Sequence, residues 1–279
     1  MSEQINFSLL EQMLSDGLYE VLQQELMALL SESKRKQDRM KLETLLSVVY
    51  GCLAKYSLAL TYSQAAYDKA EQLKDVTAMM TIATDQIMMY GRVKEFEQAQ
   101  NVANQALDYA KQLKDMKQLT RIYSDLAMLY AEKKPVQHER VLSYLRLANQ
   151  LPYETNPSFY LNVNLNIAMY EFLLMNYQKT HQILDTLQPK VEALHEVVHT
   201  CRYVRLHALV LYATEQQALF EVEQVKVEKL SSFLNDVHAQ QNYYYFLVRE
   251  AKRLNREQDV TLFTMKYQQL TDQLNHAMN

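Results

Sequence analysis

One segment of the sequence has residue types and spacing that suit catalysis. Residues 195–199 read HEVVH, so His195 and His199 stand four positions apart with Glu196 between them. On a single helix both imidazoles would share a face and could hold one zinc ion, with Glu196 as the general base. The longer form of this motif fails because Arg205 occupies the place of its third histidine. A zinc-dependent hydrolase is therefore a minor alternative to two histidines at the start of a partly exposed helix.

Other catalytic signatures are missing from the sequence. It contains no glycine-rich dinucleotide motif, no phosphate-binding loop, no G-x-S-x-G and no C-x-x-C. The three glycines of the chain are too few to build a loop that cradles phosphate. Isolated carboxylates are numerous, but on helices they usually lie on solvated faces. We therefore expect no enzyme activity, no cofactor and no resident metal.

Composition favours helices over sheets. The chain has 279 residues, 48% of them hydrophobic, with only three glycines and four prolines to make turns. No apolar run approaches the roughly 20 residues that span a bilayer, and the N-terminus does not read as a signal peptide. Two cysteines are too few for a disulfide framework, so a cytoplasmic protein is expected. A net charge of −4 argues against nucleic acid as a direct partner.

The sequence contains an internal repeat. Residues 70–75 read AEQLKD and residues 110–115 read AKQLKD. These two segments are 40 residues apart. The same interval of 40 residues separates three alanines of one copy from three of the next, namely Ala59, Ala66 and Ala70 from Ala99, Ala106 and Ala110. It also separates four successive tyrosines: Tyr50, Tyr90, Tyr130 and Tyr170. Repeats of about 40 residues are typical of stacked supersecondary units that bury a shared core.

Within each repeat the apolar residues follow helical spacing. Residues 76–90 and 96–113 predict two amphipathic helices joined by a short polar turn. Extended along the chain, this pattern predicts lead-in helices within 1–35 and six antiparallel helix pairs within 36–279, bounded at 36–75, 76–115, 116–152, 156–189, 191–236 and 239–278. No composition shift or flexible linker interrupts them, so a single domain over 1–279 is expected.

The segment 87–106 resembles a tetratricopeptide repeat (TPR). Ile87 and Tyr90 occupy the family's positions in the first helix, and Ala99, Ala103 and Ala106 match the small-residue series of the second. The period exceeds the usual length of about 34 residues and is similar to the longer repeats of kinesin light chains and bacterial peptide-sensing regulators. The resemblance is clear over 40–152 and fainter over 153–279. It implies an all-α, right-handed α-solenoid of TPR-like helix pairs.

The resemblance also implies that the first helix of each pair lines a concave groove. In that register the groove residues are Asn164, Arg121, Ser124, Thr84, Met88, Met128 and Arg92. The Asn164 carboxamide could hold the backbone of an extended peptide, and arginine suits a peptide carboxylate or an acidic side chain. The competing interpretation is that two of the three asparagines in this segment, Asn162, Asn164 and Asn166, simply face solvent.

The function expected from these features is a scaffold or receptor for a peptide or protein partner, and the resemblance implies signalling or regulation in bacteria. An alternative is the N-terminal input part of a longer signalling protein, for example a cyclic-dinucleotide synthase. The aromatic run at residues 243–246, YYYF, covers every face of a helix and could serve a homodimer. No membrane partner is expected.

Overall fold

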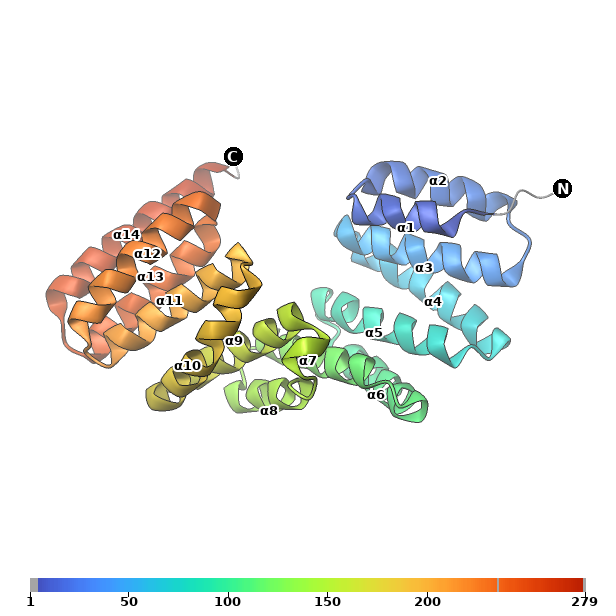
Figure 1. The fold of residues 1–279 in the computed structure, drawn as a ribbon. Coiled ribbons are helices and arrows are strands. Elements are labelled where there is room, and N and C mark those ends of the chain that lie inside the picture. Colours follow the sequence, from blue (N-terminus) through green and yellow to red (C-terminus); the bar gives the residue numbers. More distant parts are fainter. Residues whose placement is uncertain (1–4, 235, 278–279) are drawn as a thin grey trace. The chain divides into compact units, whose positions relative to one another are not determined.

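The computed structural model describes residues 5–234 and 236–277, and these residues form helices and turns with no strand among them (Figure 1). The elements are α1 (Phe7–Ser15), α2 (Tyr19–Glu32), α3 (Lys36–Cys52), α4 (Tyr56–Leu73), α5 (Val76–Arg92), α6 (Phe96–Leu113), α7 (Met116–Glu132), α8 (His138–Ala148), the 3-10 turn η1 (Tyr153–Thr155), α9 (Pro157–Leu173), α10 (Tyr177–Leu194), α11 (Val197–Ala213), α12 (Gln217–Leu234), α13 (Val237–Arg253) and α14 (Glu257–Ala277). None of the described helices has the length and hydropathy needed to cross a membrane.

Helices that follow one another pack in pairs. After α1 and α2, the pairs are α3 with α4, α5 with α6, α7 with α8, α9 with α10, α11 with α12, and α13 with α14. The all-α prediction of two lead-in helices and six helix pairs is confirmed. The contacts divide the chain into two compact units, which we call unit 1 (Met1–Gln150) and unit 2 (Leu151–Asn279). The single domain over 1–279 stays a prediction.

Short polar side chains start several of the helices. Asp75 and Asp115, one repeat apart, accept hydrogen bonds from the backbone N–H groups three residues later, at 3.0 Å in both cases. Asp236 and Asn156 do the same for α13 and α9. Such caps satisfy backbone donors that have no partner inside the helix and typically contribute about 1 kcal/mol each. They fix where the first helix of a pair begins.

Backbone geometry, rather than a shared residue type, makes the turn inside most pairs. Five turns contain one residue in the left-handed conformation: Ala54, Lys94, Met175, Glu215 and Asn255, with φ between 55° and 64°. The residue after each donates its N–H to a carbonyl five positions back, as Glu95 does to Tyr90 at 2.9 Å. This Schellman arrangement closes the C-terminus of the first helix with main-chain hydrogen bonds alone. Within each unit the turns recur at the interval of the sequence repeat.

One predicted helix boundary is wrong. The sequence places the end of a helix at Pro189, but α10 continues through this proline to Leu194. Proline removes one backbone hydrogen bond from a helix interior. The residues on either side of it, Leu187 and Val191, are only 1% and 3% exposed. Burial of these apolar side chains outweighs the loss of the bond.

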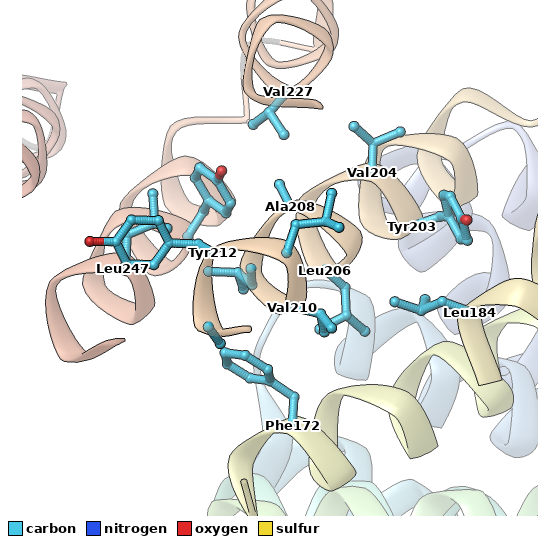
Figure 2. Close-up of a cluster of buried hydrophobic side chains, with 14 of the residues drawn as sticks. Phe172, Leu184, Tyr203, Val204, Leu206, Ala208, Val210, Tyr212, Val227 and Leu247 are labelled. Atoms are coloured by element: carbon cyan, nitrogen blue, oxygen red, sulfur yellow. The ribbon is translucent and has the colours of Figure 1, made fainter. Parts of the chain in front are cut away.

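The two units fill their cores differently. In unit 1, alanines on one face of α6 are fully buried, so neighbouring helices approach closely: Ala99, Ala103, Ala106 and Ala110. Unit 2 packs larger side chains around α11, which contacts α9, α10, α12 and α13 and therefore lies at the centre of the unit. Phe172, Leu206 and Tyr212 belong to this cluster (Figure 2). The neighbouring helices of unit 2 therefore pack their side chains against α11.

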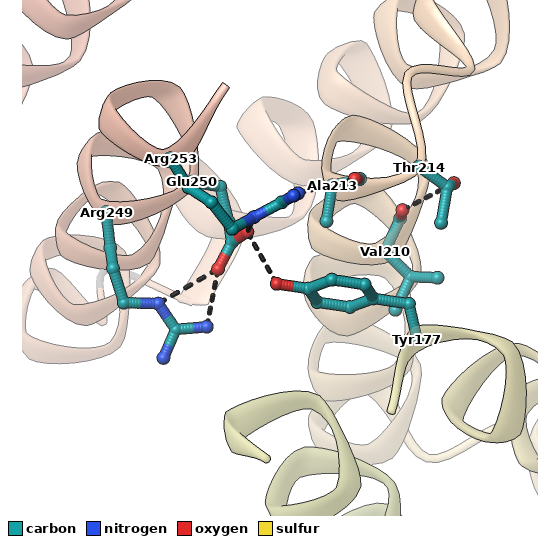
Figure 3. A network of polar contacts seen from close by, with 7 residues as sticks. All are labelled: Tyr177, Val210, Ala213, Thr214, Arg249, Glu250 and Arg253. Carbon is teal, nitrogen blue, oxygen red and sulfur yellow. Dashed lines mark hydrogen bonds and ion pairs between the residues drawn. The ribbon is translucent and has the colours of Figure 1, made fainter. Parts of the chain in front are cut away.

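A buried ionic network joins α10 to α13 in unit 2 (Figure 3). The Glu250 carboxylate, 1% exposed, accepts hydrogen bonds from Tyr177 Oη at 2.7 Å, Arg253 Nε at 2.6 Å and Arg249 Nη2 at 2.6 Å. Burial alone would raise the pKa of Glu250, but these hydrogen bonds outweigh it and lower the pKa. Arg253 also donates to the carbonyl of Ala213 at 2.6 Å. The network ties the end of α11 to both neighbouring helices.

Candidate ligand-binding pocket

Unit 2 contains a cavity of about 460 Å³ that is lined only by α9, α11 and α13. Each of these is the first helix of its pair, and α11 contacts both of the others. Most of the wall is apolar and includes Leu165, Met169, Leu173, Leu206, Leu209 and Phe246. The polar contribution comes chiefly from Arg202, Arg205 and Asn242. Apolar walls with a few convergent polar groups are the usual make-up of a ligand site.

Arg202 is held in place by two asparagines of the facing helix. Its guanidinium donates to Asn162 Oδ1 and, at 2.6 Å, to Asn166 Oδ1. These residues lie one helical turn apart on α9, so their carboxamides grip the two ends of one planar group. Burial lowers the pKa of Arg202, yet an arginine side chain stays protonated in proteins. The result is a partly buried cation whose described hydrogen-bond partners are neutral.

Arg205 is the more deeply buried of the two arginines, at 8% exposed. Its guanidinium lies 3.3 Å from Ser231 Oγ and 3.5 Å from Asp236 Oδ2, which is the long limit of a hydrogen bond. Its Nε is buried without a hydrogen-bond partner among the described residues. Buried donors are almost always satisfied. The free donor therefore suggests that an acceptor from outside the chain completes this group.

The predicted groove residues of unit 1 lie on α5 and α7. Thr84 is fully buried and donates to the Met80 carbonyl at 2.8 Å, so it offers nothing to a ligand. Ser124 is also buried, at 7% exposed. Met88 is partly buried, and Met128 is exposed.

The two predicted groove arginines are already paired. Arg92 contacts Glu132 at 2.9 Å, and Arg121 contacts Asp85 at 2.6 Å and Asp125 at 3.8 Å. A carboxylate ligand at Arg121 would have to displace two resident carboxylates. The structure therefore offers less to an anion at Arg121 than at Arg202.

Asn164, the predicted backbone-gripping residue of unit 2, is 7% exposed and donates to the Tyr160 carbonyl at 2.9 Å. Its neighbour Leu165 lines the cavity, while Asn162 and Asn166 hold Arg202. Sequence reasoning found this segment but missed Arg202 and treated Arg205 only as a failed zinc ligand. The available signal was the repeat itself, because Asn162 and Arg202 stand at matching positions of successive repeats.

The premise of the zinc motif is wrong, because residues 195–199 do not form one helix. His195 is the left-handed residue that follows α10, with φ of 56°, and α11 begins only at Val197. The two histidines therefore do not share a helical face. His199 Nε2 instead lies 2.9 Å from Ser158 Oγ and 3.1 Å from Glu196 Oε2. Within residues 5–234 and 236–277 no group of three or more potential metal ligands comes together.

Comparison with known proteins places the fold. No protein-family model and no curated protein matches the sequence. Among solved structures, the apo form of RapI has a TM-score of 0.70 at 12% identity, covering 92% of this chain and 90% of that one. Aspartyl phosphate phosphatase F from Bacillus subtilis has a TM-score of 0.70 at 14% identity, covering 94% and 67%. A Rap protein complexed with competence and sporulation factor has a TM-score of 0.67 at 11% identity, covering 96% and 74%.

These likenesses establish the fold class. The chain has the TPR-like helix-pair repeat fold of the Rap structures, as its sequence predicted. Identities of 11–14% concern the fold, and function has to be argued from the site.

Proposed function

We propose that this chain is a receptor for a peptide or an extended protein segment, bound on the α9, α11 and α13 face of unit 2. The observation that carries the proposal is the cavity of about 460 Å³, bordered by the first helices of three successive pairs. An extended segment lying across these helices would place side chains against Met169, Leu206 and Phe246. Arg202, Arg205 and Asn242 would supply hydrogen bonds that fix its position.

The structural comparisons support this class of function. One structure with the same fold is a Rap protein in complex with competence and sporulation factor. By analogy of fold, we propose a role in bacterial signalling or regulation for this chain. Another structure of the same fold is named an aspartyl phosphate phosphatase. For this chain we propose binding rather than catalysis, because the pocket combines apolar walls with arginine and amide groups, and no nucleophile stands beside a base among its lining residues.

The experiment that tests the proposal compares two methionine variants of the full chain. Met169→Glu places a carboxylate in the cavity wall, whereas Met265→Glu places one on α14, at a residue that is 64% exposed and does not line the cavity. Immobilised wild type and both variants are exposed to the same bacterial lysate, and acid-extracted peptides are identified by mass spectrometry. We expect the same peptides on wild type and Met265→Glu, and their loss from Met169→Glu. Equal recovery from all three proteins, or none from the wild type, would contradict the proposal.

A further inference from the structure

The cavity of unit 2 is positively charged. Two arginines line it, and none of the described residues that form its wall is an aspartate or glutamate. The Asp236 carboxylate lies 3.5 Å from Arg205, is partly exposed, and also caps α13. It can offset part of one charge only. The cavity therefore keeps a net positive charge that the described part of the chain does not neutralise.

This arrangement differs from that of other arginines in the same unit. Arg249, Arg253 and Arg256 each lie within 3.3 Å of a carboxylate oxygen. The described partners of the Arg202 guanidinium are the carboxamide oxygens of Asn162 and Asn166. A cation removed from water without an opposite charge is unfavourable, and an anion that arrives beside it relieves that cost.

The buried Nε of Arg205 is a second, independent observation. This atom has no hydrogen-bond partner in the described part of the chain although the residue is only 8% exposed, and Arg205 lines the same cavity. A guanidinium presents its N–H donors in a fixed fork that matches the two oxygens of a carboxylate. The unused donor and the uncompensated charge call for the same kind of ligand group.

We infer that the peptide ligand is acidic, with a carboxylate beside an apolar side chain. The carboxylate binds between Arg202 and Arg205, and the apolar side chain packs on Met169, Leu206 and Phe246. Either the C-terminus of the peptide or an Asp or Glu side chain supplies this group, and basic peptides are disfavoured. The inference rests on the proposed function and names the chemistry of its ligand.

The test uses four pools of N-acetylated pentapeptides with the full chain in equilibrium dialysis, read out by mass spectrometry. Variable positions contain only Ala, Ser, Leu and Phe, and every peptide ends in Leu. The first pool has a free C-terminal carboxylate and the second a C-terminal amide. The third and fourth are amidated and carry Glu or Lys at the fourth position. We expect the first or the third pool to bind at least about tenfold more tightly than the second and fourth.

The four pools separate the possible outcomes. Preference for the first pool identifies the C-terminal carboxylate as the ligand group, and preference for the third identifies an acidic side chain. Equal affinity for all four pools overturns the inference but leaves peptide binding intact. Tightest binding of the lysine pool, or binding of none, also overturns it. The lysate experiment then decides separately whether the proposed function stands.

Variants locate the effect at the two arginines. Arg202→Gln and Arg205→Gln remove the charge but keep hydrogen-bond donors, and Arg256→Gln removes an arginine that does not line the cavity. The first two should lose at least about tenfold in affinity for the carboxylate pools and change little for the amide pool. Arg256→Gln should bind like the wild type. Undiminished carboxylate binding by both cavity variants would overturn the inference, and the comparison of pools on wild type remains decisive if a variant fails to fold.

Discussion

At the scale of single residues, unit 1 contains a cluster of three charged side chains on α5 and α7. Arg121 lies 2.6 Å from Asp85 and 3.8 Å from Asp125, and both carboxylates are largely buried. Burial raises the pKa of Asp125 to about 7, although Arg121 opposes this shift and Asp85 adds to it. Burial likewise raises the pKa of Asp85. One arginine thus serves two carboxylates, and one of them titrates near neutral pH.

The raised pKa of Asp125 predicts a pH dependence of stability. In the unfolded chain this carboxyl has a pKa of about 3.9, so the folded state binds the extra proton between about pH 4 and 7. Its contribution to the free energy of unfolding therefore falls as pH rises through that window and is constant above it. Urea denaturation of wild type and Asp125→Asn at pH 5 and pH 8 measures this effect. The free energy of unfolding of the variant, relative to that of wild type, should be higher at pH 8 than at pH 5. An identical difference at both pH values would show that Asp125 does not titrate there.

The burial of Tyr130 leads to a second prediction about a single residue, concerning the free energy of unfolding. Its ring is 3% exposed and stacks on Tyr144 at 5.4 Å, and its hydroxyl donates to Gln100 at 2.7 Å. Tyr130→Ala should lower the free energy of unfolding by about 3–5 kcal/mol, and Tyr130→Phe by about 1 kcal/mol for the lost hydrogen bond. Tyr90, its counterpart one repeat earlier, is only partly buried, so Tyr90→Ala should cost less. Chemical denaturation of the three variants checks this order. If Tyr130→Ala left the free energy of unfolding almost unchanged, the burial of the Tyr130 ring against Tyr144 would be contradicted.

At the level of helices, some connections between pairs contain a non-glycine residue in the left-handed backbone conformation, and the steric cost of that residue can be measured. Lys114 follows α6 in the left-handed conformation, with φ of 55°, as Lys74 does one repeat earlier. A residue with a side chain pays a steric cost there that glycine avoids. Lys114→Gly should therefore raise the free energy of unfolding by up to about 1 kcal/mol. The matched control Gln105→Gly, at an exposed site inside α6, should lower it by about 1 kcal/mol. Destabilisation by both substitutions would contradict this.

The sequence predicted helices better than it predicted the site, for a physical reason. Periodicity is local, so apolar spacing predicted helices over 76–90 and 96–113, and α5 (Val76–Arg92) and α6 (Phe96–Leu113) agree with them to within two residues. The left-handed turns of unit 2 were invisible because Met175, Glu215 and Asn255 share no residue type. The pocket depends on contacts between helices, and no local pattern shows that Arg202 is paired with the carboxamides of Asn162 and Asn166.

At the scale of the whole molecule, unit 2 contains an extensive buried cluster. The buried cluster of unit 2 runs from Leu161 to Leu270, with Tyr153 and Tyr160 packed against it. The candidate pocket is lined by unit 2 alone. A core of this extent is what a domain needs to fold independently.

Residues 151–279 alone should therefore fold and keep the pocket. We expect a helical circular dichroism spectrum, a cooperative thermal transition and the same affinity for the carboxylate peptide pools as the full chain. The matching fragment 1–150 should show no preference among the pools. A non-cooperative transition for 151–279 would mean that its core depends on the rest of the chain.

The main-chain closure of the turns also bears on how far sequences with this fold can drift apart. A turn held by backbone N–H and carbonyl groups does not depend on one particular side chain at its left-handed position, as five different residue types illustrate: Ala54, Lys94, Met175, Glu215 and Asn255. Mutations can therefore accumulate at these joints without altering the path of the chain. Sequences that differ at most positions can therefore adopt this fold. A chain with 12% identity to RapI can accordingly superpose on nine-tenths of it.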